Sequence, residues 1–182
     1  MSMTHNNPVT GFTSENLLAE LDSNTDELLQ TIAAFTNEQF NTLPFEGSWT
    51  AAQVAEHLLK SESGLLKVLK GNSQPTERAV DEKIESIRSI FLDFDKKLNS
   101  PGFILPTEGR KEKEFFLDGF QKNRSAIKEL AVSIDLSRSF VDAPLPQMDV
   151  LTGLEWLCFI TCHAKRHTRQ LKNIYAIMNK GE

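Results

Sequence analysis

The sequence predicts an all-α protein, a four-helix bundle whose helices are joined by long crossover links. Apolar residues recur at spacings of three, four and seven along most of the 182-residue chain, the pattern of helices that bury one face. Capping residues and Gly or Pro breaks divide this pattern into five segments, and we find no convincing strand. Helices of this kind pack around one core as a bundle.

The first helix is expected from Ser14 to about Phe35, before a break at residues 43–47 that contains Pro and Gly. The second opens at Thr50, a good N-cap, with Gln53 three residues on to complete a capping box. It is expected to run to about residue 70, where a Gly-Asn pair provides a stop signal.

Three further helical segments follow. The apolar spacing predicts one helix over residues 84–98, ended by Pro101–Gly102, and another over residues 111–134. Residues 142–146 contain two prolines and are interpreted as a rigid link. The last helix is predicted over residues 152–178 and begins with a second capping box.

Composition limits the class of protein. We expect a frayed or disordered tail over residues 1–12 and a single domain over residues 13–180. A net charge of −5 argues against nucleic acid as the main partner. The absence of a long apolar run argues against a membrane span, and the polar first residues do not resemble a signal peptide, so the expected location is cytoplasmic. Cys158 and Cys162, four residues apart, are interpreted as packing residues at a helix contact.

Two histidines on the last predicted helix indicate a possible site. His163 and His167 lie one turn apart, about 40° from each other, in the middle of the apolar face. Buried together, two protonated rings would repel each other, and two neutral rings need partners for four nitrogens. A divalent cation would accept a lone pair from each ring. The alternative is that both are ordinary core residues with hydrogen-bond partners.

A third histidine favours the metal interpretation. His57 lies at the edge of the buried face of the second predicted helix, in line with the small residues Ser61 and Gly64, which leave space beside the imidazole. Close helix packing is an equally good reason for these small residues. His5 falls in the tail and is expected to be solvated.

The chain resembles the DinB-like superfamily, which includes the YfiT-type metal-dependent hydrolases. The resemblance rests on the run Trp49–Leu58, WTAAQVAEHL, and on His163 and His167 followed by Gln170–Leu171. It covers the chain from about residue 14 to residue 178. It implies an up-down-down-up bundle, frequent homodimers, and a divalent metal, zinc or nickel, held by His57, His163 and His167.

Three neutral imidazoles leave coordination positions open, as in catalytic metal sites. We therefore expect a metal-dependent hydrolase or a thiol-dependent transferase acting on a small molecule. Glu56 points about 100° away from His57 on the helix and is discounted as a general base. The alternatives are a non-catalytic binding module with a vestigial metal site, and a bundle that binds no metal.

Overall fold

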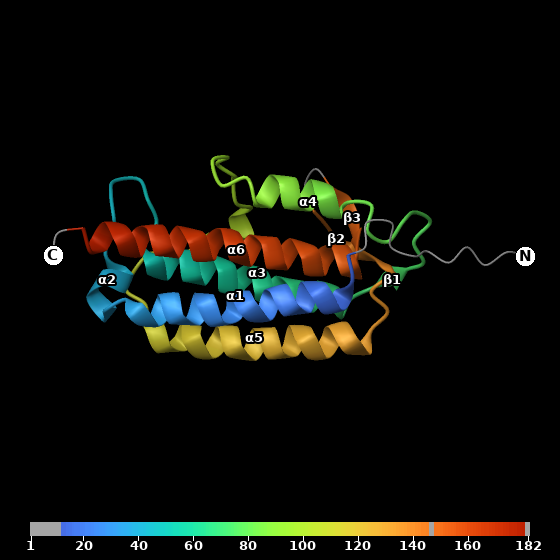
Figure 1. Cartoon of the computed structure of the whole chain (residues 1–182), viewed down its shortest axis with the longest axis horizontal. Coiled ribbons are helices and arrows are strands. Elements are labelled where there is room, and N and C mark those ends of the chain that lie inside the picture. The colour runs from blue at the N-terminus through green and yellow to red at the C-terminus, as the bar shows by residue number, and fades with distance from the viewer. Residues whose placement is uncertain (1–11, 146–147, 181–182) are drawn as a thin grey trace, which may run out of the picture.

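The computed structural model describes residues 12–145 and 148–180. Over these residues the chain is mostly helical, with six α-helices, one short 3-10 helix and a small three-stranded sheet. The four longest helices lie side by side, and the sheet lies at the end of the bundle opposite the C-terminal end of the last helix (Figure 1).

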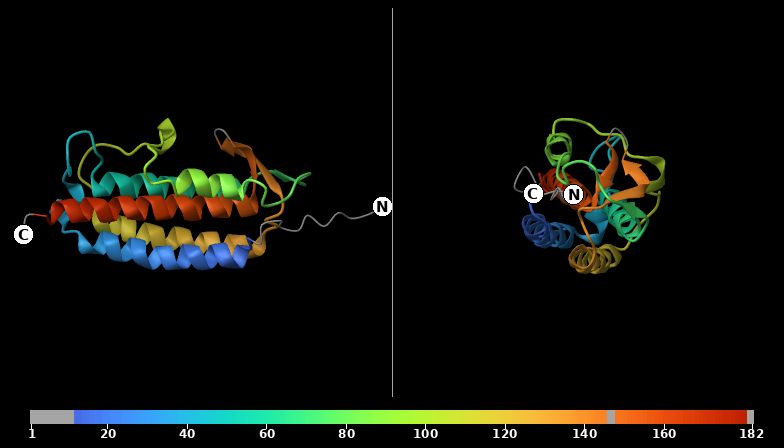
Figure 2. Two further views of the ribbon diagram at one scale, coloured as in Figure 1. Left: turned by 45° about the horizontal axis from the view of Figure 1, so that its top comes forward. Right: turned by 90° about the vertical axis from the view of Figure 1, so that its right-hand side faces the viewer.

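The long helices are α1 (Ser14–Ala34), α3 (Ala51–Leu69), α5 (Lys113–Ser133) and α6 (Gly153–Met178). α1 packs against α5 and α6, and α3 packs against the same two helices, so each helix has two long neighbours (Figure 2). The prediction of a helical fold is confirmed.

Both predicted capping boxes are present. Thr50 accepts a hydrogen bond from the backbone N–H of Gln53, whose side-chain oxygen accepts from the backbone N–H of Thr50. Thr152 and Glu155 make the same reciprocal pair at the start of α6. These boxes satisfy N–H groups that have no partner within the helix, and they set the start of the two helices that carry the predicted ligands.

Three shorter helices complete the helical part: α2 (Asn37–Asn41), α4 (Ile84–Phe91), which packs against α6, and the 3-10 helix η1 (Gly102–Ile104). The sequence pattern did not indicate α2 or η1. Both are too short to show a helical repeat of apolar residues.

The third predicted helix is shorter than expected. It was predicted over residues 84–98 but ends at Phe91. The Asp93 carboxylate accepts a hydrogen bond from the backbone N–H of Asp95, a local bond that competes with helix. The Arg166 guanidinium of α6 also donates to the carbonyl oxygens of Phe91 and Asp93. Both contacts draw the chain out of the helix.

The expectation that no strand is present was wrong. β1 (Ser73–Gln74), β2 (Ser139–Leu145) and β3 (Asp149–Thr152) form an antiparallel sheet in the order β1-β2-β3. Ser139 pairs with both Gln74 and Thr152. Most of the predicted rigid link therefore lies in β2. Pro144 argues against a central strand, yet β1 is so short that it pairs only with Ser139 and Phe140, and the register of β2 with β3 is irregular between Phe140 and Leu145.

Polar residues divide the core into two apolar halves. Each long helix contributes apolar side chains to both clusters, with polar side chains between them. Among these, four buried residues form what we call the polar layer: Asn24, Glu62, Arg124 and Thr168. Arg124 donates to Glu62 Oε1 at 2.8 and 3.1 Å and to Asn24 at 3.1 Å, and Asn24 donates to Thr168 at 3.0 Å. One hydrogen-bonded network thus joins all four long helices.

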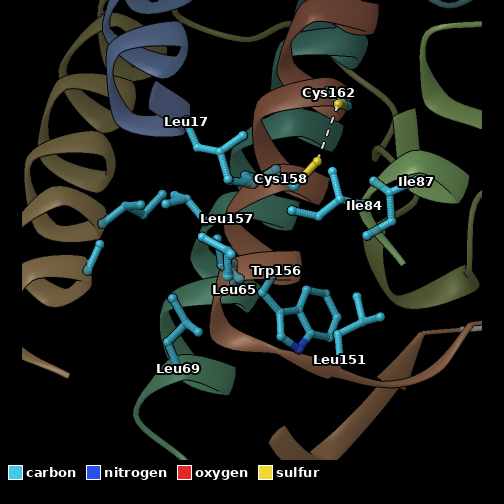
Figure 3. Packing of buried hydrophobic residues seen from close by; sticks show 14 of the residues in the cluster. Leu17, Leu65, Leu69, Ile84, Ile87, Leu151, Trp156, Leu157, Cys158 and Cys162 are labelled. Carbon is cyan, nitrogen blue, oxygen red and sulfur yellow. Dashed lines mark hydrogen bonds between the residues drawn. The ribbon is translucent and has the colours of Figure 1, made fainter. Parts of the chain in front are cut away.

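The two cysteines lie in the half of the core nearer the sheet. Cys158 and Cys162 are fully buried among apolar side chains that include Leu17 and Ile84, and their sulfur atoms lie 4.0 Å apart (Figure 3). Both are free thiols. Their burial confirms the interpretation as packing residues.

Two sequence-based expectations lie outside the described residues. These are the frayed tail, apart from Phe12, and the solvated state of His5.

No helix within residues 12–145 and 148–180 combines the length and the apolarity that a membrane span needs.

The polar layer leads to a prediction about stability. Substituting Arg124→Met should lower the free energy of unfolding by about 3–5 kcal/mol, because the fully buried Glu62 carboxylate would lose its partner. Urea denaturation at pH 7 measures the change. The control is Lys128→Met, which removes an exposed ion pair with Asp22 and should cost under about 1 kcal/mol. Equal losses in the two variants would contradict this account of the polar layer.

Candidate metal centre

Two helices bring the three predicted histidines to one place. His57 lies in the second turn of α3, after the capping box at Thr50, and His163 and His167 lie one turn apart on α6. All three are buried, with 1%, 6% and 8% of their surface exposed. Their side chains form a group in which the possible ligand nitrogens all lie within 4.8 Å of one another.

The Nε2 atoms are the nitrogens that converge. His163 Nε2 lies 3.2 Å from His57 Nε2 and 3.0 Å from His167 Nε2. His163 is therefore the central ring of the three, in contact with His57 of α3 on one side and with His167, one turn along its own helix, on the other. The rings meet edge to face, with centroids 4.5 to 5.1 Å apart.

The outer nitrogens of two rings have acceptor partners. His57 Nδ1 lies 3.0 Å from the carbonyl oxygen of Ile104, and His167 Nδ1 lies 2.8 Å from Gln170 Oε1. Since each oxygen only accepts, we assign the ring hydrogen to Nδ1 in both cases. In the neutral state, Nε2 of His57 and of His167 then carries a lone pair directed at His163.

His163 has a different environment. Its ring is stacked on Phe159, with centroids 5.4 Å apart and planes 12° from parallel. The Phe91 ring lies nearly perpendicular to it, with centroids 6.0 Å apart. Its Nδ1 is buried and has no hydrogen-bond partner among the residues that the structure describes. Phe159 and Phe91 thus fix the plane of the His163 ring by packing, whereas hydrogen bonds at Nδ1 fix the rings of His57 and His167.

Burial lowers the pKa of all three histidines below the ordinary value of 6.5. The pKa of His167 falls to about 3, mainly because burial penalises the charged ring and secondly because His57 lies beside it. Burial and the two neighbouring imidazoles hold the pKa of His163 well below its usual range. For His57, burial outweighs the hydrogen bond to Ile104, which acts to raise the pKa. The rings are therefore neutral at pH 7.

The cluster has the form expected of a cation site. At most one hydrogen, on His163 Nε2, is available to separate three converging nitrogens, whereas a cation would accept all three lone pairs. Nitrogens bound at about 2.05 Å lie roughly 3.3 Å apart around a tetrahedral ion and roughly 2.9 Å apart at adjacent octahedral positions. The observed 3.0 and 3.2 Å fall between these values. The residues present therefore fit a divalent transition metal.

Other residues singled out in the sequence lie outside this cluster. Glu56 forms ion pairs with Lys60 and Lys111 and accepts from Thr107, and these contacts lower its pKa to about 2, although burial acts in the other direction. It is committed to these partners, as its direction on the helix predicted. Ser61 donates to the carbonyl oxygen of His57.

The tryptophans and Gly64 have distinct roles around the site. The Trp49 ring contacts the His57 ring at a centroid distance of 5.2 Å, so it forms one wall of the cluster. Among the described residues, the ring contact of Trp156 is with Phe159, the ring that stacks on His163, so Trp156 supports His163 indirectly. A Cβ on Gly64 would meet no atom within 4 Å, so that position does leave space.

Three contributors were missed in the sequence. Gln170 had been noted only as part of a motif, and its spacing of three from His167 was the available signal for its hydrogen bond to the ring. Phe159 follows the same rule, four residues before His163. The Ile104 carbonyl had no signal, since any residue can provide a backbone oxygen.

Comparison with known proteins identifies the family of the chain. The chain is 27% identical over 153 residues to YuaE of Bacillus subtilis strain 168, an uncharacterized protein, and the match covers 79% of this chain and 87% of that protein. No solved structure matches the chain. Residues 6–171 match the sequence model of the DinB superfamily, and the chain belongs to that superfamily.

Proposed function

We propose that this protein binds one divalent transition-metal ion through the Nε2 atoms of His57, His163 and His167. The observation that carries the proposal is the convergence of three buried, neutral imidazole nitrogens from two helices, two of them oriented by acceptors at Nδ1. Such outer hydrogen bonds are the usual support of metal-bound histidines. Zinc or nickel suits an all-imidazole ligand set.

Three protein ligands leave coordination positions for water or substrate. When bound, the ion would supply Lewis acidity towards a water or thiol ligand, which loses its proton more easily there. His57 and His167 would donate lone pairs while their Nδ1–H groups remain bound to Ile104 and Gln170. Phe159 and Trp49 would exclude bulk water from the ring faces that they cover.

Between hydrolysis and thiol transfer, we favour thiol transfer to a small-molecule electrophile. Hydrolysis commonly uses a nearby carboxylate as general base. Among the described residues the ligand group contains histidines alone, Glu56 is held by two lysines, and Glu62 is paired with Arg124. A zinc-bound water keeps a pKa of about 7, whereas coordination deprotonates a thiol outright, so thiol transfer depends less on such a base.

The alternative is a non-catalytic module in which the metal has a structural role. The near-complete burial of the three rings favours it, because a substrate cannot reach the metal unless part of the chain moves.

We further infer an up-down-down-up bundle: in Figure 1 the colour gradients of α1 and α6 run one way and those of α3 and α5 the other. The homodimer and the cytoplasmic location that the sequence suggested remain predictions.

Metal content tests the first proposal. Protein purified without an affinity tag and reconstituted with zinc should hold one ion per chain. His57→Gln and His163→Gln should each weaken zinc binding by more than the roughly 10- to 100-fold that loss of an outer-shell partner costs. Competition with a chromophoric chelator measures the affinity, and His5→Gln serves as the control. Unchanged affinity in both ligand variants would remove the site.

The low pKa values predict weak competition by protons. Because burial keeps the rings neutral well below pH 6.5, zinc affinity should fall less than about 10-fold from pH 7.5 to 5.5. Three imidazoles with the ordinary pKa of 6.5 would lose about 1000-fold over that range. The same lowered pKa values affect the metal-free fold. The stability that depends on neutral histidines is fully present above pH 6.5 and is lost as the pH falls towards 3, because the unfolded chain then binds protons that the folded chain does not. A steep loss of affinity by pH 5.5 would contradict the neutral cluster.

Turnover tests the catalytic proposal. Zinc- or nickel-loaded protein should accelerate attack of a thiol on 1-chloro-2,4-dinitrobenzene, in which a C–S bond forms, the C–Cl bond breaks and the thiol proton passes to buffer. The absorbance of the thioether product reports the rate. His163→Gln should abolish the acceleration. Metal-loaded protein that shows no turnover with thiols, esters or amides would favour the non-catalytic module.

A further inference from the structure

The connection between α4 and α5 is unusually long and lies on the surface. It spans residues 92–112, and η1 is its one element of regular structure. None of its residues is buried. Connections longer than about 12–15 residues without their own structure are uncommon in compact domains and are often active-site lids. We call residues 92–106 of this connection the strap.

The first part of the strap is held by α6. The Arg166 guanidinium donates to the carbonyl oxygen of Asp93 at 2.8 Å and also contacts the carbonyl oxygen of Lys96. The Arg169 guanidinium lies over the Phe94 ring, 4.6 Å from its centroid. These two arginines flank His167 in sequence, one residue before it and two residues after it.

The last part of the strap is held by α3. The Ile104 carbonyl oxygen accepts from His57 Nδ1 at 3.0 Å, and the Leu105 carbonyl oxygen accepts from Lys60 Nζ at 2.8 Å. Lys60 lies three residues after His57. The strap is thus anchored at one end on α6 residues that neighbour His167 in sequence and at the other end on His57 itself, so it connects the two helices that carry the histidines.

Polar contacts hold most of the strap in place. Three of its large apolar side chains are exposed, Phe94 by 40%, Phe103 by 83% and Leu105 by 45%. Its other large apolar side chains are half-buried, and of these Leu92, at its start, packs against the core. Segments with few buried apolar contacts open locally at a small fraction of the global free energy of unfolding. The helices that carry the histidines are instead held by apolar side chains buried in both halves of the core, so the strap has far less buried apolar surface than they have.

We propose that the strap is a gate over the metal centre that is coupled to metal binding through His57. Closure places the Ile104 carbonyl on Nδ1, which directs the Nε2 lone pair of His57 towards His163. Opening frees the outer face of His57 and admits metal and substrate. The proposal rests on the proposed metal site, and it names the segment that controls access to it.

The experiment combines amide hydrogen exchange with zinc release. By reciprocity, zinc should slow exchange of strap amides by at least 10-fold, and amides in the middle of α5 serve as the internal reference. Zinc release is timed by transfer to an excess of chromophoric chelator. The variant is Lys60→Met, which keeps most of the side-chain stem and removes the donor to Leu105 together with the ion pair to Glu56, which keeps Lys111 as a partner. The control is Lys67→Met, an exposed lysine two turns further along α3.

Lys60→Met should accelerate both strap exchange and zinc release by about 10-fold or more, whereas Lys67→Met should leave both unchanged. Electrostatics alone predicts the opposite for release, since removal of a positive charge near a cation slows its departure. Strap amides that exchange at one rate with and without zinc would overturn the gate in a protein that binds zinc. So would unchanged release from Lys60→Met.

The two proposals fail in different ways. A wild-type protein that takes up no zinc overturns the metal site. The gate is then judged on metal-free protein, where strap amides must exchange faster than those of α5 and faster again in Lys60→Met. Strap amides that exchange only together with α5 would overturn the gate in that case too.

Discussion

The desolvation of three imidazoles is the constraint on which the site depends. Burial removes the charged state from all three rings, because each would have to be protonated in a low-dielectric environment next to two like groups. A neutral ring has one hydrogen to donate, and two of the three have already given theirs to Ile104 and Gln170. The one remaining hydrogen, on His163, cannot serve both neighbouring lone pairs fully, whereas a cation would accept a lone pair from all three rings.

The rest of the bundle holds these rings in place. The two capping boxes set where α3 and α6 begin, and the polar layer ties both helices to α1 and α5. A buried Glu–Arg pair is weak evidence of stability, because hydrophobic replacements of similar volume are often as stable. Here the pair also holds the helices at fixed positions along one another. Arg124 donates to Asn24, which donates to Thr168, the residue that directly follows His167 on α6. Around the rings, aromatic packing by Phe159 and Trp49 replaces water.

The helical part of the fold and the ligand set could be predicted because both depend on local rules. Thr50 and Gln53 satisfy a capping pattern three residues long, and His163 and His167 share a helix face by simple periodicity. His57 required a second helix to lie opposite, which the apolar faces and the family resemblance suggested.

What could not be predicted depends on contacts between distant segments. The early end of α4 involves Arg166, more than 70 residues away, and β2 depends on pairing with two strands of only two and four residues. The strap and its Ile104 carbonyl are invisible to side-chain patterns, because a backbone oxygen belongs to every residue. Sequence spacing therefore located the three histidines, while the groups that orient and cover them required the structure.

Anomalous diffraction from crystals of untagged, zinc-reconstituted protein tests the central claim most directly. The account predicts one strong peak at the zinc edge, about 2.0–2.1 Å from the Nε2 atoms of His57, His163 and His167. Clear density for the three rings with no peak between them, or zinc bound only at surface side chains, would contradict it.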